Sequence, residues 1–140
     1  MSLVFWDTNL FIYYIEDRGP QADRVQFVRE RMLERNDQLV TSCLTLGEVL
    51  VKPKNDQRPD LAAAYERVLT EHARLIPLDR NVATRYAAIR CDRRIKAPDA
   101  IQLACAAHAG VDLFITNDDR LSRAVIPGIQ FITSLERAFL

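Results

Sequence analysis

Short apolar runs alternate along the chain with longer stretches in which apolar residues recur at helical spacing. A run of about four largely apolar residues bounded by turn residues is typical of a buried strand. Four such runs predict strands at residues 3–6, 38–41, 75–78 and 113–116, and residues 129–132 are a candidate fifth strand.

Helices are predicted in the stretches between these runs, because their apolar residues lie three or four positions apart and caps or prolines mark their ends. Pro53 is expected to stop one helix and to open a polar loop over residues 52–60. Pro59 and Pro98 suit helix starts, and Gly110 suits a helix end. The predicted helices cover residues 10–15, 21–35, 45–51, 61–72, 81–91, 99–109 and 134–139.

Strands that alternate with helices predict an α/β fold, here a three-layer α/β/α sandwich with a mostly parallel central sheet of four or five strands. The chain has 140 residues and no linker-like segment or internal repeat, so residues 1–140 are expected to form a single domain. In such a sheet the functional crevice lies outside the carboxyl ends of the strands.

Four acidic residues border apolar segments, where a buried carboxylate is costly unless it has a partner or binds a cation. Two of them follow predicted strands and two lie on predicted helices. Several acids at the carboxyl edge of one sheet would line a single oxygen-rich pocket, the kind of site that holds Mg²⁺ or Mn²⁺. The four residues are Asp7, Glu48, Asp99 and Asp118.

Each of these acids also has a purely structural interpretation. Asp7 and Asp99 could cap helices, and Asp118 could belong to a turn. Glu48 could pair with an arginine, although the leucines and valines around it argue against a fully solvated position. Four separate structural explanations account for the pattern less well than one shared site.

Hydroxyl and amide side chains flank the acids. We expect them to orient the carboxylates or to complete the acidic site through water, although turn and cap chemistry would explain them equally well. They are Thr8, Asn9, Thr116 and Asn117, and Asp119 is a further acid that could share the role of Asp118.

Composition narrows the function further. The chain has 19 basic and 19 acidic residues, so its formal charge is zero and any nucleic-acid contact must be local. Cys43, Cys91 and Cys105 are widely spaced and lack a CxxC pair, which predicts buried free thiols in a reducing compartment. With no signal peptide and no apolar stretch long enough for a membrane span, we expect a cytoplasmic protein.

Four motifs in chain order resemble those of PIN-domain nucleases. No single motif is specific, but the four together are, and their order and spacing are close to the VapC-like toxins of toxin–antitoxin pairs. The resemblance extends from Leu3 to about Ile132. The motifs are Asp7-Thr8-Asn9, Thr45-x-x-Glu48, Pro98-Asp99-Ala100-Ile101-Gln102-Leu103-Ala104 and Phe114-Ile115-Thr116-Asn117-Asp118.

The resemblance implies a Mg²⁺- or Mn²⁺-dependent endoribonuclease, a hydrolase that acts as a toxin. It further implies that the chain forms a homodimer and that a small antitoxin protein neutralises it. Contact with DNA would be indirect, through the antitoxin. The four acids match the family's metal-site acids by position, and Thr116 matches its conserved hydroxyl neighbour. Many members carry another acid two residues after the Asp118 position, where this chain has Arg120, so the choice between Asp118 and Asp119 as fourth acid stays open.

Basic residues just before Asp99 are candidate contacts for RNA phosphates. They are Arg93, Arg94 and Lys96. A solvated face with ion pairs to Asp92 explains them at least as well.

Two other functions fit parts of the pattern. A receiver-like signalling domain could use Asp79 as its phospho-acceptor, but it would need an acidic pair after the first strand and a lysine after the last one. A catalytically silent PIN-like module could bind RNA or protein, and the presence of all four matching acids argues against it.

Overall fold

The computed structural model describes residues 1–139. Its centre is a five-stranded sheet in the order β3-β2-β1-β4-β5, in which every neighbouring pair is parallel. The strands are β1 (Leu3–Trp6), β2 (Gln38–Ser42), β3 (Arg74–Ile76), β4 (Leu113–Thr116) and β5 (Phe131–Ser134).

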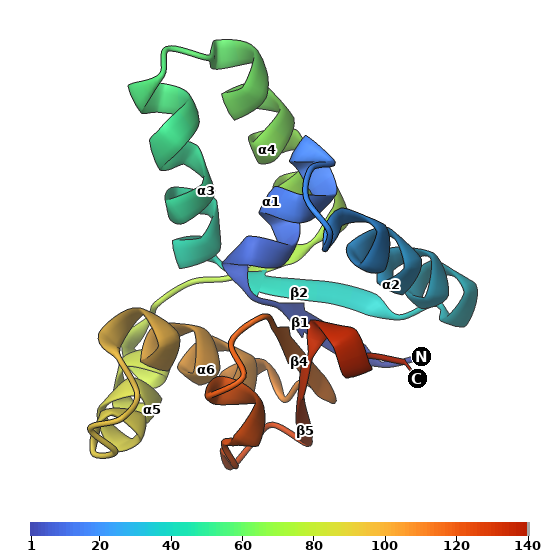
Figure 1. The fold of residues 1–140 in the computed structure, drawn as a ribbon. Coiled ribbons are helices and arrows are strands. Elements are labelled where there is room, and N and C mark those ends of the chain that lie inside the picture. The colour runs from blue at the N-terminus through green and yellow to red at the C-terminus, as the bar shows by residue number, and fades with distance from the viewer. Residues whose placement is uncertain (140) are drawn as a thin grey trace.

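Six α-helices and two short 3₁₀ turns connect the strands, as Figure 1 shows. The helices are α1 (Thr8–Glu16), α2 (Ala22–Arg35), α3 (Cys43–Asn55), α4 (Pro59–His72), α5 (Arg80–Arg90) and α6 (Ala97–Ala109). The 3₁₀ turns are η1 (Leu121–Arg123) and η2 (Leu135–Arg137). No helix among residues 1–139 is both long and apolar enough to cross a membrane.

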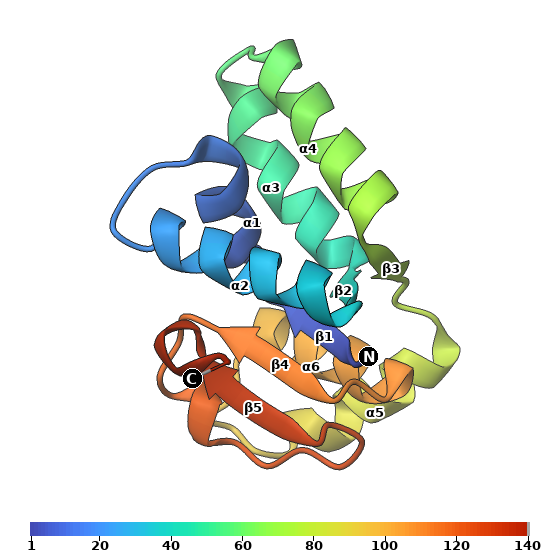
Figure 2. The same ribbon diagram turned by 90° about the vertical axis from the view of Figure 1, so that its right-hand side faces the viewer.

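The sheet lies between two helical layers, with α1 to α4 on one face and α5 and α6 on the other (Figure 2). Alternation along β1 makes this possible, because Val4 and Trp6 pack toward the first layer and Phe5 packs toward the second. Phe5 stacks on Phe114 of β4 with ring centroids 4.9 Å apart. The predicted three-layer sandwich is confirmed, and its sheet is entirely parallel.

The strand order places a topological switch between β1 and β4. The chain first adds β2 and β3 on one side of β1 and then returns to pair β4 with its other side. In open parallel sheets a crevice forms where the strand order reverses in this way, outside the carboxyl ends of the two strands. Asp7 directly follows β1, and Asp118 lies two residues beyond β4.

The expectation that Pro53 ends its helix is wrong, because α3 continues to Asn55. A proline this close to the end of a helix removes one backbone donor, and the following turn still closes. The N–H of Asp56 donates to the carbonyl of Lys52 at 2.9 Å, and that of Arg58 donates to the carbonyl of Pro53 at 2.7 Å. The expected loop over residues 52–60 therefore shrinks to residues 56–58.

Other element boundaries also differ from expectation. β3 ends at Ile76, since Pro77 has no N–H to continue the ladder. β5 begins at Phe131, which pairs with Leu113. Residues 134–139 form only the 3₁₀ turn η2 and not a helix. All three cysteines are free, but only Cys105 is buried, so the expectation of buried thiols is wrong for Cys43 and Cys91.

Gly128 is the glycine whose replacement the fold resists most clearly. Its φ is 98°, and a Cβ there would lie 2.9 Å from the backbone oxygen of Ala107 on α6. We expect Gly128→Ala to lower the free energy of unfolding by about 2–4 kcal/mol, through backbone strain and overpacking together. Urea unfolding monitored by circular dichroism measures the loss.

Gly110→Ala is the matched control. Gly110 also has a positive φ, 69°, but a Cβ there would meet nothing within 4 Å. Gly110→Ala should therefore lower the free energy of unfolding through backbone strain alone, by about 1–2 kcal/mol. Equal losses in the two variants would contradict the close approach of Gly128 to α6.

Candidate functional site

A cavity of about 470 Å³ opens at the carboxyl edge of the sheet, between β1 and β4. It brings together the four candidate acids and all five of their proposed helper residues, from four separate segments of the chain. Its lining is Asp7, Thr8, Asn9, Glu48, Pro98, Asp99, Gln102, Thr116, Asn117, Asp118, Asp119 and Arg120.

Asp7 stands at the centre of this cavity and also caps a helix. Its backbone N–H donates to the carbonyl of Ile115 at 3.1 Å, which continues the pairing of β1 with β4. One carboxylate oxygen, Oδ1, accepts the N–H of Thr8 at 2.9 Å at the start of α1. The cap interpretation from the sequence is therefore correct, and it coexists with a place in the acidic cavity.

Thr116 connects the ends of the two central strands. Its buried hydroxyl donates to Oδ2 of Asp7 at 2.9 Å and accepts the backbone N–H of Asp118 at 3.0 Å. A single side chain thus determines how the loop after β4 lies relative to the acid after β1.

Gln102 is a site residue that the sequence did not reveal. It lies on α6, one turn after Asp99, and only 2% of its surface is exposed. Its amide nitrogen lies 2.7 Å from Thr45 Oγ1, 3.1 Å from Thr8 Oγ1 and 3.4 Å from Asp7 Oδ1. Its amide oxygen accepts the hydroxyl of Ser42, which orients the amide so that its donors face the acids.

Glu48 reaches the cavity from α3. The hydroxyl of Thr8 donates to its Oε1 at 2.6 Å. Glu48 itself is exposed, while Thr45 and Val49 turn inward, so the expectation that its apolar neighbours would shield it is wrong. Among residues 1–139 it makes no ion pair with an arginine, which removes its simplest structural explanation.

Burial and neighbouring charges disfavour the ionised form of two acids in the cavity. Burial raises the pKa of Asp7, and the nearby charge of Glu48 adds to this, although hydrogen bonds from Thr8, Thr116 and Gln102 oppose it. Burial also raises the pKa of Asp99, and the charges of Asp7 and Asp118 raise it further. These shifts show that the carboxylates lie close enough to repel one another.

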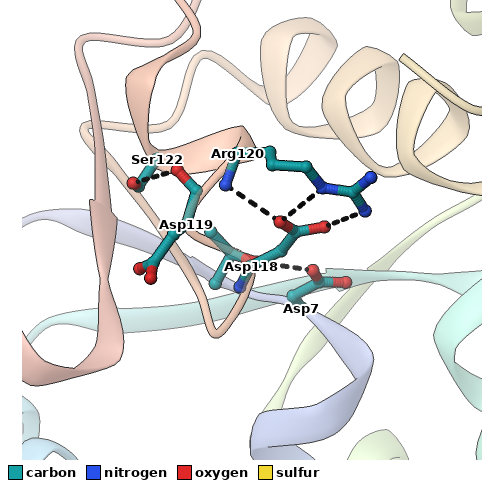
Figure 3. A network of polar contacts seen from close by, with 6 residues as sticks. Asp7, Asp118, Asp119, Arg120 and Ser122 are labelled. Carbon is teal, nitrogen blue, oxygen red and sulfur yellow. Dashed lines mark hydrogen bonds and ion pairs between the residues drawn. The ribbon is translucent and has the colours of Figure 1, made fainter. Parts of the chain in front are cut away.

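Asp118 is the exception, because it has a cation of its own. The guanidinium of Arg120 holds the pKa of Asp118 below its usual range. Asp119 also lines the cavity, but its side chain is exposed and its recorded contact is the backbone carbonyl that accepts the hydroxyl of Ser122. Figure 3 shows Asp118 beside Asp7, whereas the carboxylate of Asp119 points away from Asp7 and only its backbone carbonyl faces Ser122.

The donor set of this cavity suits a hard divalent cation, since it consists of carboxylate, hydroxyl and amide oxygens without histidine or cysteine. The present side-chain conformations do not yet surround an ion. Within residues 1–139, no three His, Cys, Asp or Glu side chains form a ready-made metal-binding group. Glu48 is bonded to Thr8 through one oxygen only, whereas both oxygens of Asp118 are bonded to Arg120, so Asp118 would have to release its arginine to bind an ion directly.

The other sequence candidates lie outside the acidic cavity. Arg93, Arg94 and Lys96 are exposed and absent from its lining, and Arg94 is paired with Asp92 at 2.9 Å. Asp79 accepts the N–H of Val82 at 2.9 Å and caps α5 after the edge strand β3. That position separates Asp79 from the acids and removes the support for a receiver-like phosphorylation site.

Comparison with known proteins finds a matching family and a similar protein. It matches the PIN domain family over residues 4–126. It is 30% identical over 126 residues to Ribonuclease VapC23 from Mycobacterium tuberculosis (strain CDC 1551 / Oshkosh), which covers 87% of this chain and 98% of the relative.

Solved structures share its fold. VapBC2 from Rickettsia felis, bound to a DNA fragment from its promoter, matches with a TM-score of 0.74 at 16% identity, over 94% of this chain and 98% of that one. DNA-bound VapBC from Salmonella typhimurium matches with a TM-score of 0.72 at 22% identity, over 96% of this chain and 99% of that one.

The raised pKa of Asp99 predicts how stability depends on pH. A carboxyl whose pKa is raised by folding stabilises the protein fully below the unfolded value, and this stabilisation is lost as the pH rises through the folded value. Without divalent ions, Asp99→Asn should therefore be more stable than the natural chain at about pH 7, and the difference should shrink toward about pH 4. Urea unfolding in EDTA at both pH values measures it.

Asp118→Asn should change the stability of the protein in the opposite direction to Asp99→Asn. The pKa of Asp118 is lowered, so its contribution is present at neutral pH and is lost as the pH falls through the folded value. This variant should lose stability at about pH 7, by no more than about 1 kcal/mol, because its arginine partner is exposed. If both variants gained stability at about pH 7, or both lost it, the charge distribution described above would be contradicted.

Gln102 can be tested by two substitutions of similar size. Gln102→Leu removes the buried hydrogen bonds and should cost about 1–3 kcal/mol of unfolding free energy. Gln102→Glu keeps the shape and adds a negative charge beside Asp7, so it should bind Mn²⁺ more tightly than the leucine variant does. Calorimetric titration with Mn²⁺ compares them, and equal affinities would reduce Gln102 to a packing residue.

Proposed function

The chain belongs to the PIN-domain family, and we propose that it is a divalent-metal-dependent endoribonuclease, the toxin of a toxin–antitoxin pair. The observation that carries this proposal is the convergence of Asp7, Glu48, Asp99 and Asp118 on one cavity at the switch point of the sheet. The name of the relative, a ribonuclease of 30% identity over nearly its full length, supports RNA as the substrate.

Asp7 and Asp99 are the proposed main ligands of the cation, because their pKa values are raised and a cation would remove that penalty. Glu48 and Asp118 complete the pocket, directly or through water. A bound Mg²⁺ or Mn²⁺ supplies charge neutralisation at the phosphate and lowers the pKa of the attacking water.

The residues around the acids then hold them in place for this chemistry. Thr116 and the N–H of Thr8 occupy one lone pair on each oxygen of Asp7, which directs the remaining lone pairs into the cavity. The hydroxyl of Thr8 holds one oxygen of Glu48 and leaves the other for a ligand. Such preorganisation keeps the carboxylates from reorienting as charge develops on the phosphate.

We also propose the partners that the family resemblance implies. They are an RNA substrate, a small antitoxin protein and a second copy of this chain. The structural neighbours support the antitoxin, since they are VapBC complexes, and the two described above are bound to DNA. DNA would then be reached through the antitoxin. A cytoplasmic location follows from the proposed substrate.

Removing a central acid should abolish RNA cleavage. Asp7→Asn and Asp99→Asn should each lower the Mg²⁺-dependent cleavage rate by at least about 10²-fold, and EDTA should abolish it in the natural chain. Asp60→Asn is the matched control, because Asp60 lies in the first turn of α4 as Asp99 does in α6, yet it is exposed and remote from the cavity lining. The measurement is gel-resolved cleavage of total cellular RNA by antitoxin-free protein.

Full activity in either central variant would refute the assignment of these acids. If the natural chain cleaves no RNA, titration with Mn²⁺ decides between the alternatives. Binding without cleavage points to the wrong substrate, whereas absence of binding favours the catalytically silent module.

A further inference from the structure

Arg120 lies within the acidic cavity and chelates one of its carboxylates. Its backbone N–H donates to Oδ1 of Asp118 at 2.9 Å, its Nε to the same oxygen at 3.2 Å and its Nη2 to Oδ2 at 3.0 Å. Figure 3 shows this fork closed over Asp118, with Asp7 beside it. Both oxygens of Asp118 thus already have a cationic partner.

The same local clamp occurs a second time in the chain, at residues that do not line the acidic cavity. Arg94 holds Asp92 through its backbone N–H, Nε and Nη2, at 3.1, 3.0 and 2.9 Å. The clamp itself is therefore a property of an Asp-x-Arg turn. What distinguishes Arg120 is its place, because its charge also acts on Asp99 and opposes the rise of that acid's pKa.

The clamp changes the number of carboxylates that a cation can use. Asp118 is neutralised by Arg120, and the carboxylate of Asp119 points away from Asp7 (Figure 3). This leaves Asp7, Asp99 and Glu48 as the acids that face one another in the cavity without a cationic partner among residues 1–139. Three carboxylates carry three negative charges, so one divalent ion neutralises two of them and leaves a single negative charge. A second ion would have to displace a bidentate guanidinium, which is the strongest kind of side-chain partner for a carboxylate.

The guanidinium keeps donors for a further ligand. Arginine has five N–H groups, and Asp118 uses only Nε and one N–H of Nη2. The side chain is 72% exposed, so the remaining donors can meet a phosphate that enters the cavity. A planar fork of this kind binds the non-bridging oxygens of a phosphate in pairs.

We propose that the acidic cavity takes one divalent cation per chain and that Arg120 stands in for a second, holding Asp118 on one side and binding the scissile phosphate of the RNA on the other. The single-ion part stands on the cavity alone, whereas the phosphate contact rests on the proposed function. The two parts are tested separately.

The ion count is tested without RNA. Calorimetric titration with Mn²⁺, checked by the electron paramagnetic resonance signal of unbound Mn²⁺, should give one ion per natural chain. Arg120→Gln frees Asp118 and removes a positive charge, so it should bind Mn²⁺ about tenfold more tightly or take up a second ion. Arg58→Gln, which opens an exposed ion pair with Asp60 away from the cavity lining, should bind as the natural chain does.

Two ions bound by the natural chain would overturn the single-ion proposal. It would equally be overturned if Arg120→Gln and Arg58→Gln bound Mn²⁺ alike. Both outcomes can be read even if the chain cleaves no RNA, so they are distinct from a failure of the proposed function.

The phosphate contact is tested by cleavage kinetics at saturating Mg²⁺. Arg120→Gln should lower kcat by about 10²-fold, since it removes a charged donor from the reacting phosphate, and Arg120→Lys should recover part of the loss. Arg58→Gln, which opens an exposed ion pair with Asp60 away from the cavity lining, should leave kcat unchanged. An Arg120→Gln enzyme with the kcat of the natural chain would overturn the contact, and so would a lysine variant no better than the glutamine one.

Discussion

The repulsion among carboxylates gathered at one edge of the sheet is the constraint on which the rest of the site depends. Asp7 and Asp99 have raised pKa values because they are buried near other negative charges. Left alone, such a group would separate or take up protons. The fold prevents separation by attaching the acids to different rigid elements, the end of β1 and the first turn of α6, whose positions the core determines.

Hydrogen-bond donors offset part of this cost. Asp7 accepts from a backbone N–H and from Thr116, while Gln102 lies within reach of the same carboxylate. Hydrogen bonds to a charged group contribute about 1.5–3 kcal/mol each, and here they favour the ionised form of Asp7 against the effect of burial on its pKa. The directions of these bonds are set by partners outside the cavity, since Ser42 donates to the amide oxygen of Gln102 and leaves the amide nitrogen for the acids. The cavity is therefore rigid on its inner side and adjustable where Glu48 and Arg120 face solvent.

Much of the fold could be predicted because the relevant signals are local. A four-residue apolar run such as Leu3–Trp6, followed by a capping acid, identifies a strand and the start of a helix without reference to the rest of the chain. Boundaries failed where partners decide them. β5 begins at Phe131 because that residue pairs with Leu113, while Ile129 packs into the core before the strand starts. Pro53 stays within α3 because it is buried in the packing of that helix, which outweighs its lost donor.

The amino-acid sequence by itself determined which residues carry the chemistry, since the four acids and their hydroxyl neighbours recur at strand ends and helix starts in a recognisable order. Only the tertiary structure decided which of these side chains contact one another and which neighbours they acquire. Gln102 sits in an alanine-rich helical run and gives no signal until α6 packs beside β2. Glu48 likewise had no assigned partner until α3 packed beside α1, where Thr8 donates to it, and Arg120 came to act on Asp99 only when the loop after β4 met α6. The physical reason is that charge and hydrogen-bond capacity belong to single residues, whereas pairing and burial depend on distances across the sheet that the chain order does not contain.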